Sequence, residues 1–102
     1  MEKNSIVYLL KIITEDRTLY KIGYTGGDVG KRVKSLQTGC PYEIHIADKF
    51  ITNLGRKVET SLHNILTHKK MFGEWFDLDF SDEFNFNSLC ERYENIYDVI
   101  KK

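Results

Sequence analysis

The order of apolar and polar positions divides the chain into short strands and helices. Residues 6–13, IVYLLKII, are apolar and rich in β-branched side chains, which is typical of a buried strand. The polar stretch TEDRT follows, and residues 19–24, LYKIGY, form a second apolar run. We therefore expect an antiparallel hairpin in this part of the chain. Residues 43–50, EIHIADKF, alternate in part and predict a third strand.

Two helices are predicted between and after these strands. The first covers residues 29–38, where Asp28 is a suitable N-cap and Gly39 lies just past the C-terminal end. The second covers residues 54–70. Apolar side chains recur at helical spacing in both. These positions are Val29, Val33 and Leu36 in the first helix, and Leu54, Val58, Leu62 and Ile65 in the second.

The C-terminal part of the chain predicts an irregular or short extended segment and a further helix. Residues 73–78, GEWFDL, form that segment, and a helix of about residues 86–100 follows. Ser88 and Glu91 have the spacing of a capping box, so we expect this helix to begin near them. The whole order predicts one domain, residues 1–102, of the α/β (α+β) class with a small, mainly antiparallel sheet.

Composition supports a single ordinary globular domain, but the charge is unevenly distributed. The chain has 102 residues, 41% of them hydrophobic, and a net charge of zero. Residues 1–73 hold 12 Lys and Arg against 7 Asp and Glu, a net +5, and residues 74–102 hold 3 against 8, a net −5. The basic part is suited to binding phosphates, although a solvated surface explains the same pattern.

The sequence gives little sign of export or membrane insertion. The first residues, MEKNSIVYLLKII, lack the pattern of a signal peptide, and no apolar run approaches the roughly 18 residues that span a bilayer. Two cysteines, Cys40 and Cys90, are too few for a disulfide scaffold. We therefore expect a cytoplasmic protein, in the host cytoplasm if the chain is viral.

The glycine-rich stretch YKIGYTGGDVGKR, residues 20–32, raises the question of a phosphate-binding loop. A P-loop would need glycine at Thr25 and Ser or Thr at Arg32, so that motif is excluded. We expect turn glycines that lead the strand into the helix. Glu59 and His63 lie four residues apart on a helix, but a zinc-protease helix would need histidine at Val58.

Three polar residues border predicted apolar faces. Arg32 flanks the stripe of the first helix, Glu59 flanks the stripe of the second, and Tyr8 lies in an aliphatic strand. They could converge on one shallow cleft. An ordinary salt bridge between Arg32 and Glu59, with Tyr8 as a core aromatic, explains their positions equally well.

Five short segments, in this order, resemble the GIY-YIG nuclease superfamily over about residues 6–79. They most resemble its viral and bacterial branch, whose second motif reads KIG. The segments are VYLL, which ends the first motif around Tyr8; YKIGYT, the second motif; GKRVKSLQTGCP, the helix with Arg32; KVETSLHNIL, with Glu59; and GEWFDL, a closing element of that branch. The resemblance implies a three-stranded antiparallel sheet flanked by helices, here with an extra C-terminal helix.

The resemblance also implies a mechanism, metal-dependent cleavage of DNA phosphodiester bonds. Tyr8 would act as general base or hold the attacking water. Glu59 would bind Mg²⁺ or Mn²⁺, and Arg32 would neutralise charge on the phosphate. The partner would be DNA, with RNA not excluded. The further site candidates are Lys21 and His63 for catalysis, and Tyr20, Tyr24, Lys31 and Lys34 for nucleic-acid binding.

The chain departs from the family pattern at two positions. Lys21 stands where the second motif usually opens with tyrosine, and a lysine near Tyr8 would favour the phenolate. Leu36 stands where many relatives have histidine or tyrosine, for which His63 or His45 could substitute. The alternative is therefore a catalytically inactive module that binds nucleic acid, a nucleotide or a protein partner. The acidic region after Glu74 is the candidate surface for a protein partner.

Overall fold

A five-stranded antiparallel sheet forms the centre of the protein. The computed structural model describes residues 4–101, so both ends of the predicted domain lie outside the described residues. The strand order is β3-β1-β2-β5-β4, and every neighbouring pair is antiparallel. The strands are β1 Ser5–Ile13, β2 Thr18–Thr25, β3 His45–Thr52, β4 Lys70–Phe72 and β5 Trp75–Phe76. The predicted α+β class with an antiparallel sheet flanked by helices is confirmed, with five strands instead of three.

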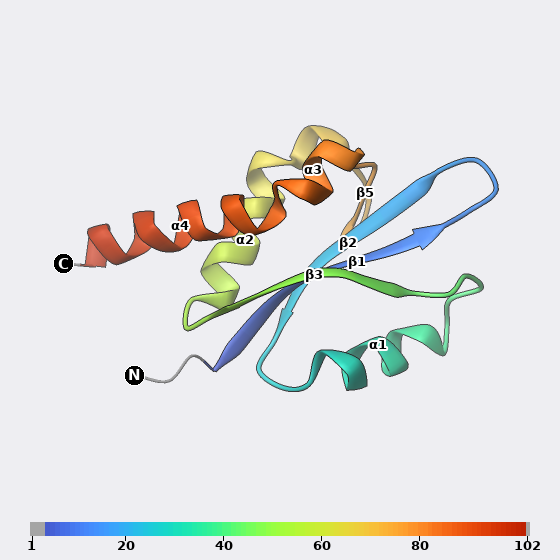
Figure 1. Ribbon diagram of the computed structural model, residues 1–102, viewed down its shortest axis with the longest axis horizontal. Helices are drawn as coiled ribbons and strands as arrows, with labels where there is room; N and C mark the ends of the chain where they lie inside the picture. Colours follow the sequence, from blue (N-terminus) through green and yellow to red (C-terminus); the bar gives the residue numbers. More distant parts are fainter. Residues whose placement is uncertain (1–3, 102) are drawn as a thin grey trace.

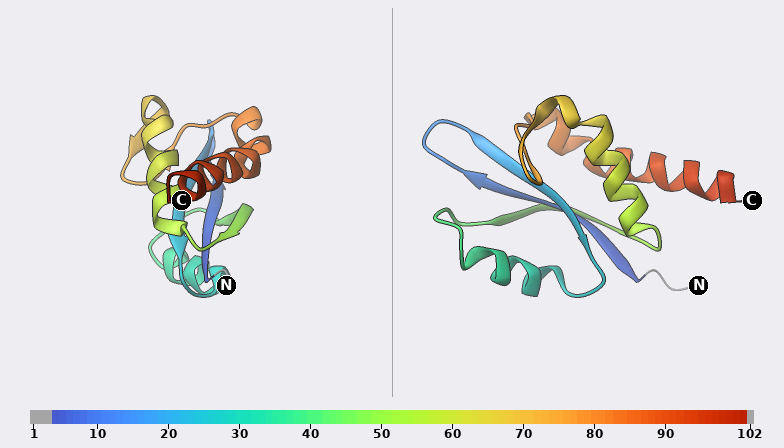
Figure 2. Two further views of the ribbon diagram at one scale, coloured as in Figure 1. Left: turned by 90° about the vertical axis from the view of Figure 1, so that its left-hand side faces the viewer. Right: turned by 180° about the vertical axis from the view of Figure 1, so that it is seen from behind.

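Helices cover both faces of the sheet, as Figures 1 and 2 show. α1, Val29–Gln37, lies on one face, and α2, Gly55–Ile65, lies on the other together with α4, Phe86–Lys101. Side chains alternate along β1, so that Val7 and Leu9 belong to the core under α2 and α4, whereas Tyr8 and Leu10 belong to the core under α1. The central strand is thus buried on both faces, which explains its unbroken apolar run.

The first predicted helix has the expected start. The carboxylate of Asp28 accepts hydrogen bonds from the backbone N–H groups of Gly30 and Lys31, at 2.7 and 3.3 Å. This cap satisfies two of the amides that the first turn leaves without partners. α1 ends at Gln37, one residue before the predicted end.

The second helix is shorter than predicted, because its last residues form part of the sheet. α2 ends at Ile65, and a 3₁₀ turn, Thr67–Lys69, leads into β4. The apolar stripe would need an apolar residue at Lys69, seven positions after Leu62, so the pattern gives no reason to continue the helix. Gly73 then turns the chain at a φ of 56°, and β5 pairs with Tyr20 and Lys21 of β2.

The predicted capping box at Ser88 and Glu91 is wrong. α4 begins at Phe86, so that Ser88 lies inside the helix. A short helix, α3 Phe80–Phe84, precedes it and has its own capping box, formed by Asp79 and Asp82. The core decides the start of α4, since the side chain of Phe86 is already only 3% exposed.

The far end of α4 extends beyond the sheet, as Figure 1 shows. Its predicted apolar positions Ile96 and Ile100 are 41% and 71% exposed. The apolar stripe of this helix therefore packs on the domain only over its first turns. Across residues 4–101, no helix combines the length and apolar character required to cross a membrane.

Candidate functional site

Tyr8 and Gly23 face each other across the β1–β2 ladder and create the floor of the site. The side chain of Tyr8 is 1% exposed on the α1 face of the sheet. A Cβ atom on Gly23 would lie 2.5 Å from the Tyr8 hydroxyl oxygen and 2.7 Å from its ring carbon Cζ. Gly23 therefore provides space for the phenol ring, and the expectation that it serves as a turn residue is wrong.

Arg32 lies above this phenol on α1. Its Nε donates a hydrogen bond of 3.4 Å to the Tyr8 hydroxyl oxygen. That hydrogen bond, with a smaller contribution from the charge of Glu74, raises the pKa of Arg32. The guanidinium is exposed and permanently charged. A fixed positive charge is thus held at the surface directly over a buried hydroxyl.

Lys21 shares this face of the sheet but forms its ion pair with Glu74. The Lys21 Nζ lies 2.9 Å from a Glu74 carboxylate oxygen and 5.5 Å from the centre of the Trp75 ring. The residue is only 9% exposed, whereas the side chain of Glu74 is 42% exposed. The cation in direct contact with Tyr8 is consequently Arg32, and not the lysine that the sequence suggested for this role.

Glu59 lies between two contacts that fix α2 against β2. Gly55 packs against Tyr24, since a Cβ on Gly55 would lie 3.2 Å from the Tyr24 ring. Two turns later, the Nε2 of His63 forms a 2.8 Å hydrogen bond with the carbonyl oxygen of Ile22. Gly55, Glu59 and His63 share one helix face, because they are four residues apart. Glu59 therefore lies beside β2, where the charges of Lys21 and Glu74 act on its carboxylate.

Glu59 is a partly buried carboxylate with a raised pKa. Burial raises the pKa of Glu59, and the charge of Glu74 acts in the same direction, while His63, Lys21 and Arg56 oppose it. Within residues 4–101, the side-chain carboxylate of Glu59 has no hydrogen bond or ion pair. The carboxylate oxygens are thus available to an external ligand.

The protein groups that could bind a metal ion at this site are few. Among the described residues, no group of three or more His, Cys, Asp or Glu side chains is placed to hold a metal. Mg²⁺ commonly takes one or two protein carboxylates and completes its shell with water and substrate phosphate. Glu59 offers one such carboxylate, so its chemistry fits that mode of binding.

Residues 5–102 match the T5orf172 domain. The chain belongs to this family. T5orf172 domains occur in nuclease-like proteins of phages and bacteria. No curated protein and no solved structure matches the chain.

The remaining candidates of this T5orf172 domain lie in different places. Lys31 and Lys34 are exposed on α1, and Tyr24 is 40% exposed beside the start of α2. Tyr20 lies on the opposite face of the sheet, 4% exposed, and its hydroxyl donates a 2.7 Å hydrogen bond to Glu83. Burial raises the pKa of Tyr20. Tyr20 is therefore outside the site and belongs to the core under α2 and α4.

Two residues without a predicted role lie at the site. Lys49 is exposed on β3 and is the ladder partner of Tyr8 on the side opposite Gly23. Glu74 forms the ion pair with Lys21. Glu74 belongs to the segment GEWFDL, which the sequence had already indicated as a motif. Nothing in the sequence indicated Lys49, because its position beside Tyr8 depends on the β1–β3 register.

Many acidic side chains of the C-terminal part are engaged within the T5orf172 domain. Ion pairs join Lys11 to Glu83, Arg17 to Asp77, and Lys69 to both Asp79 and Asp82. The charge asymmetry along the sequence is thereby neutralised in part by the fold. These contacts tie α3 and the segment before it to the sheet.

Proposed function

We propose that this T5orf172 domain is a metal-dependent endonuclease of the GIY-YIG type that hydrolyses DNA phosphodiester bonds. The observation that carries the proposal is the contact between Arg32 and Tyr8 beside the α2 face that holds Glu59. Tyr8 comes from β1 and Arg32 from α1, which covers the same face of the sheet as the Tyr8 ring. Glu59 comes from α2, which covers the other face. The contact gives the buried hydroxyl a partner and at the same time holds a permanent positive charge at a fixed place on the surface.

Arg32 would bind the scissile phosphate. Its guanidinium uses Nε for Tyr8 and is exposed, which leaves its terminal N–H groups for phosphate oxygens. Charge that develops on the phosphate in the transition state is stabilised by such a preorganised donor. Lys31 and Lys34 on the same helix would contact the neighbouring backbone phosphates.

Tyr8 would position the attacking water. Its oxygen accepts the hydrogen bond from Arg32, so that the phenol is oriented before substrate arrives. The packing of its ring on Gly23 leaves little freedom to turn away. As a phenolate, Tyr8 would take the proton of the attacking water; as a neutral phenol, it would hold that water by a hydrogen bond, and the proton would pass to bulk water.

Glu59 would hold the metal ion, Mg²⁺ or Mn²⁺. The bound ion would polarise the phosphate and stabilise the leaving oxygen. His63 would act as a positioning residue, because its hydrogen bond to Ile22 fixes α2 at this edge of β2. Lys21, paired with Glu74, contributes positive charge at the border of the same site.

A second candidate is a binding module that has kept the fold without cleavage. The observation that favours it is the Lys21–Glu74 ion pair, since Lys21 replaces the second-motif tyrosine and its ammonium already has a partner. Such a module would bind DNA in a salt-dependent way, and binding would change little with magnesium or with Glu59→Gln.

The test is nicking of supercoiled plasmid DNA by the purified chain, with magnesium, with manganese and with chelator. The variant Glu59→Gln removes the carboxylate charge at nearly constant shape, and Glu91→Gln is the matched control, since Glu91 is exposed on α4. We expect metal-dependent nicking by the wild type and Glu91→Gln, and none by Glu59→Gln. Full activity of Glu59→Gln would exclude the mechanism. No nicking by the folded wild type would favour the binding module.

A further inference from the structure

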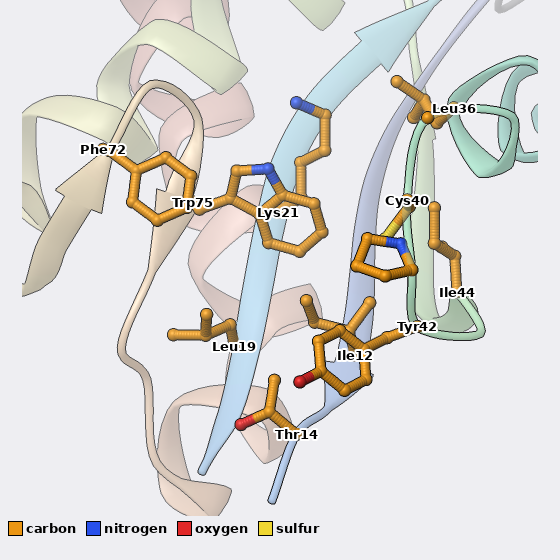
Figure 3. A pocket seen from close by; sticks show the side chains of 12 residues that line it. Ile12, Thr14, Leu19, Lys21, Leu36, Cys40, Tyr42, Ile44, Phe72 and Trp75 are labelled. Carbon is orange, nitrogen blue, oxygen red and sulfur yellow. The ribbon is translucent and has the colours of Figure 1, made fainter. Parts of the chain in front are cut away.

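A hollow of about 430 Å³ lies on the α1 face of the sheet beside the candidate site. Figure 3 shows its walls. Trp75 and Phe72 of the β4–β5 hairpin form one side, and Leu36 of α1 lies on the opposite side. Ile12 and Tyr42 close the lower end. The volume falls within the range of about 300 to 1,000 Å³ that small-ligand pockets have.

The hollow lies next to the proposed phosphate site. Lys21 lines it and also forms the ion pair with Glu74. Leu36, another lining residue, lies one helical turn after Arg32. A ligand that occupies the hollow therefore has the exposed Arg32 guanidinium one helical turn beyond the Leu36 wall, which suits a ligand with an apolar, flat part and an attached anion.

We propose that this hollow binds the base of an unpaired nucleotide next to the phosphate held by Arg32. Bases stack on aromatic side chains, and a positive groove alongside holds the backbone in proteins that bind single strands. Trp75, Phe72 and Tyr42 supply aromatic surface, and Phe72 is 62% exposed. The inference rests on nucleic-acid binding at the proposed site, but it does not require cleavage.

The polar groups of the hollow indicate stacking without strong base selection. The hydroxyl of Tyr42 donates to Glu15, and that of Thr14 donates to Asp16. The Lys21 ammonium is paired with Glu74. Since these groups already have partners, aromatic and aliphatic surface remains as the main contact. A base that is still paired in a duplex cannot offer its faces to such a wall, so the preferred substrate would contain a single-stranded or flipped nucleotide.

Tryptophan fluorescence tests this proposal directly, because Trp75 is the only tryptophan in the chain. The full chain, in chelator to prevent cutting, is titrated with a short single-stranded DNA oligonucleotide. The comparison ligands are an oligonucleotide of equal length made of abasic sites and a blunt duplex. We expect strong quenching by the single strand, and weak quenching by the abasic strand and the duplex. Equal quenching by the abasic strand would overturn the proposal.

Two exposed phenylalanines provide a matched pair of variants that keep the reporter. Phe72→Ala removes a wall of the hollow, whereas Phe80→Ala changes a phenylalanine that is 78% exposed on α3 and does not line it. We expect Phe72→Ala to weaken binding of the single strand by roughly fivefold or more, and Phe80→Ala to leave it unchanged. Equal affinities of the two variants would overturn the proposal.

The plasmid assay separates this inference from the proposed function. Quenching that depends on the bases, without nicking of the plasmid or of the single strand in magnesium, supports the base site and favours the binding module over the nuclease. Metal-dependent nicking without base-dependent quenching supports the nuclease and excludes the base site.

Discussion

The phenol ring of Tyr8 lies against the backbone of Gly23, its partner across the β1–β2 ladder. The contact is so close that no other residue type has space at position 23 without displacing the ring. The same ring carries the hydroxyl that Arg32 reaches. Packing between these two residues therefore determines where the candidate site places its oxygen.

Gly23→Ala is expected to destabilise the domain. The added methyl group would lie 2.5 Å from the Tyr8 hydroxyl oxygen in a fully packed core. Such overpacking costs about 1–3 kcal/mol in the free energy of unfolding, and the displaced hydroxyl should lower any nicking activity as well. Urea denaturation measures the first effect, and the plasmid assay the second.

Gly39→Ala is the control for that experiment. A Cβ on Gly39 would meet no atom within 4 Å, and its φ is not positive. The free energy of unfolding should change by no more than about 0.5 kcal/mol. If Gly23→Ala is as stable as Gly39→Ala, the close packing of Tyr8 on Gly23 is not present in solution.

Arg32→Lys tests whether the guanidinium does more than carry charge. Lysine keeps the positive charge but loses the planar fork that holds Tyr8 and phosphate oxygens together. If Arg32 stabilises the transition state, nicking should fall by about two to three orders of magnitude. The free energy of unfolding should also fall, by about 1–3 kcal/mol, if the buried Tyr8 hydroxyl loses its donor, so rates are compared under conditions in which urea denaturation shows the variant folded. Arg92→Lys, at an exposed position of α4, is the matched control, and equal rates for the two variants would refute the assignment.

Lys31→Ala and Lys34→Ala should weaken DNA binding in proportion to the phosphates they neutralise. Each lost phosphate contact lowers the slope of log affinity against log salt by about 0.9 for a duplex and 0.7 for a single strand. Binding measured over a series of salt concentrations in chelator gives these slopes. Lys57→Ala is the control, because Lys57 lies on α2 with its Nζ over the Tyr97 ring. A slope for Lys31→Ala and Lys34→Ala equal to that of the control would place the DNA elsewhere.

Acid should weaken the attachment of α3 through Asp82. Burial alone would raise the pKa of Asp82, but hydrogen bonds from the Lys69 ammonium and from the backbone N–H of Asp79 outweigh it, so the pKa lies below the ordinary value of an aspartate. A carboxylate whose pKa is depressed in the folded state adds stability above its unfolded pKa. That stability is lost as the pH falls through the folded value.

Asp82→Asn should therefore lower the free energy of unfolding by about 1 kcal/mol at neutral pH, since it removes the ion pair and part of the capping box. Urea denaturation of wild type and variant at several pH values should show this difference shrinking below about pH 4. The exposed α4 residue Asp98 provides the control variant Asp98→Asn. A difference that stays constant with pH would contradict the lowered pKa of Asp82.

Local sequence determined the elements whose signals are contained within a few residues. The hairpin of β1 and β2 and the capped start of α1 were predicted, because apolar runs and the Asp28 side chain act on adjacent backbone. The C-terminal end of α2 and the β4–β5 hairpin were not, and the helix of about residues 86–100 was predicted with the wrong cap. The first two depend on the edge of β2, with which Trp75 and Phe76 pair. The start of the last helix depends on the burial of Phe86.

The candidate site shows the same division. The sequence by itself singled out Tyr8, Arg32 and Glu59, because polar side chains at the margins of apolar faces are readable from periodicity. Only the tertiary structure decided that Arg32 contacts Tyr8, that Lys21 pairs with Glu74, and that Tyr20 faces away. Strand register and the choice of sheet face set these outcomes, since a shift of one residue reverses every side chain of a strand. Such a choice is made by packing between segments that are distant in the sequence, and no single segment encodes it.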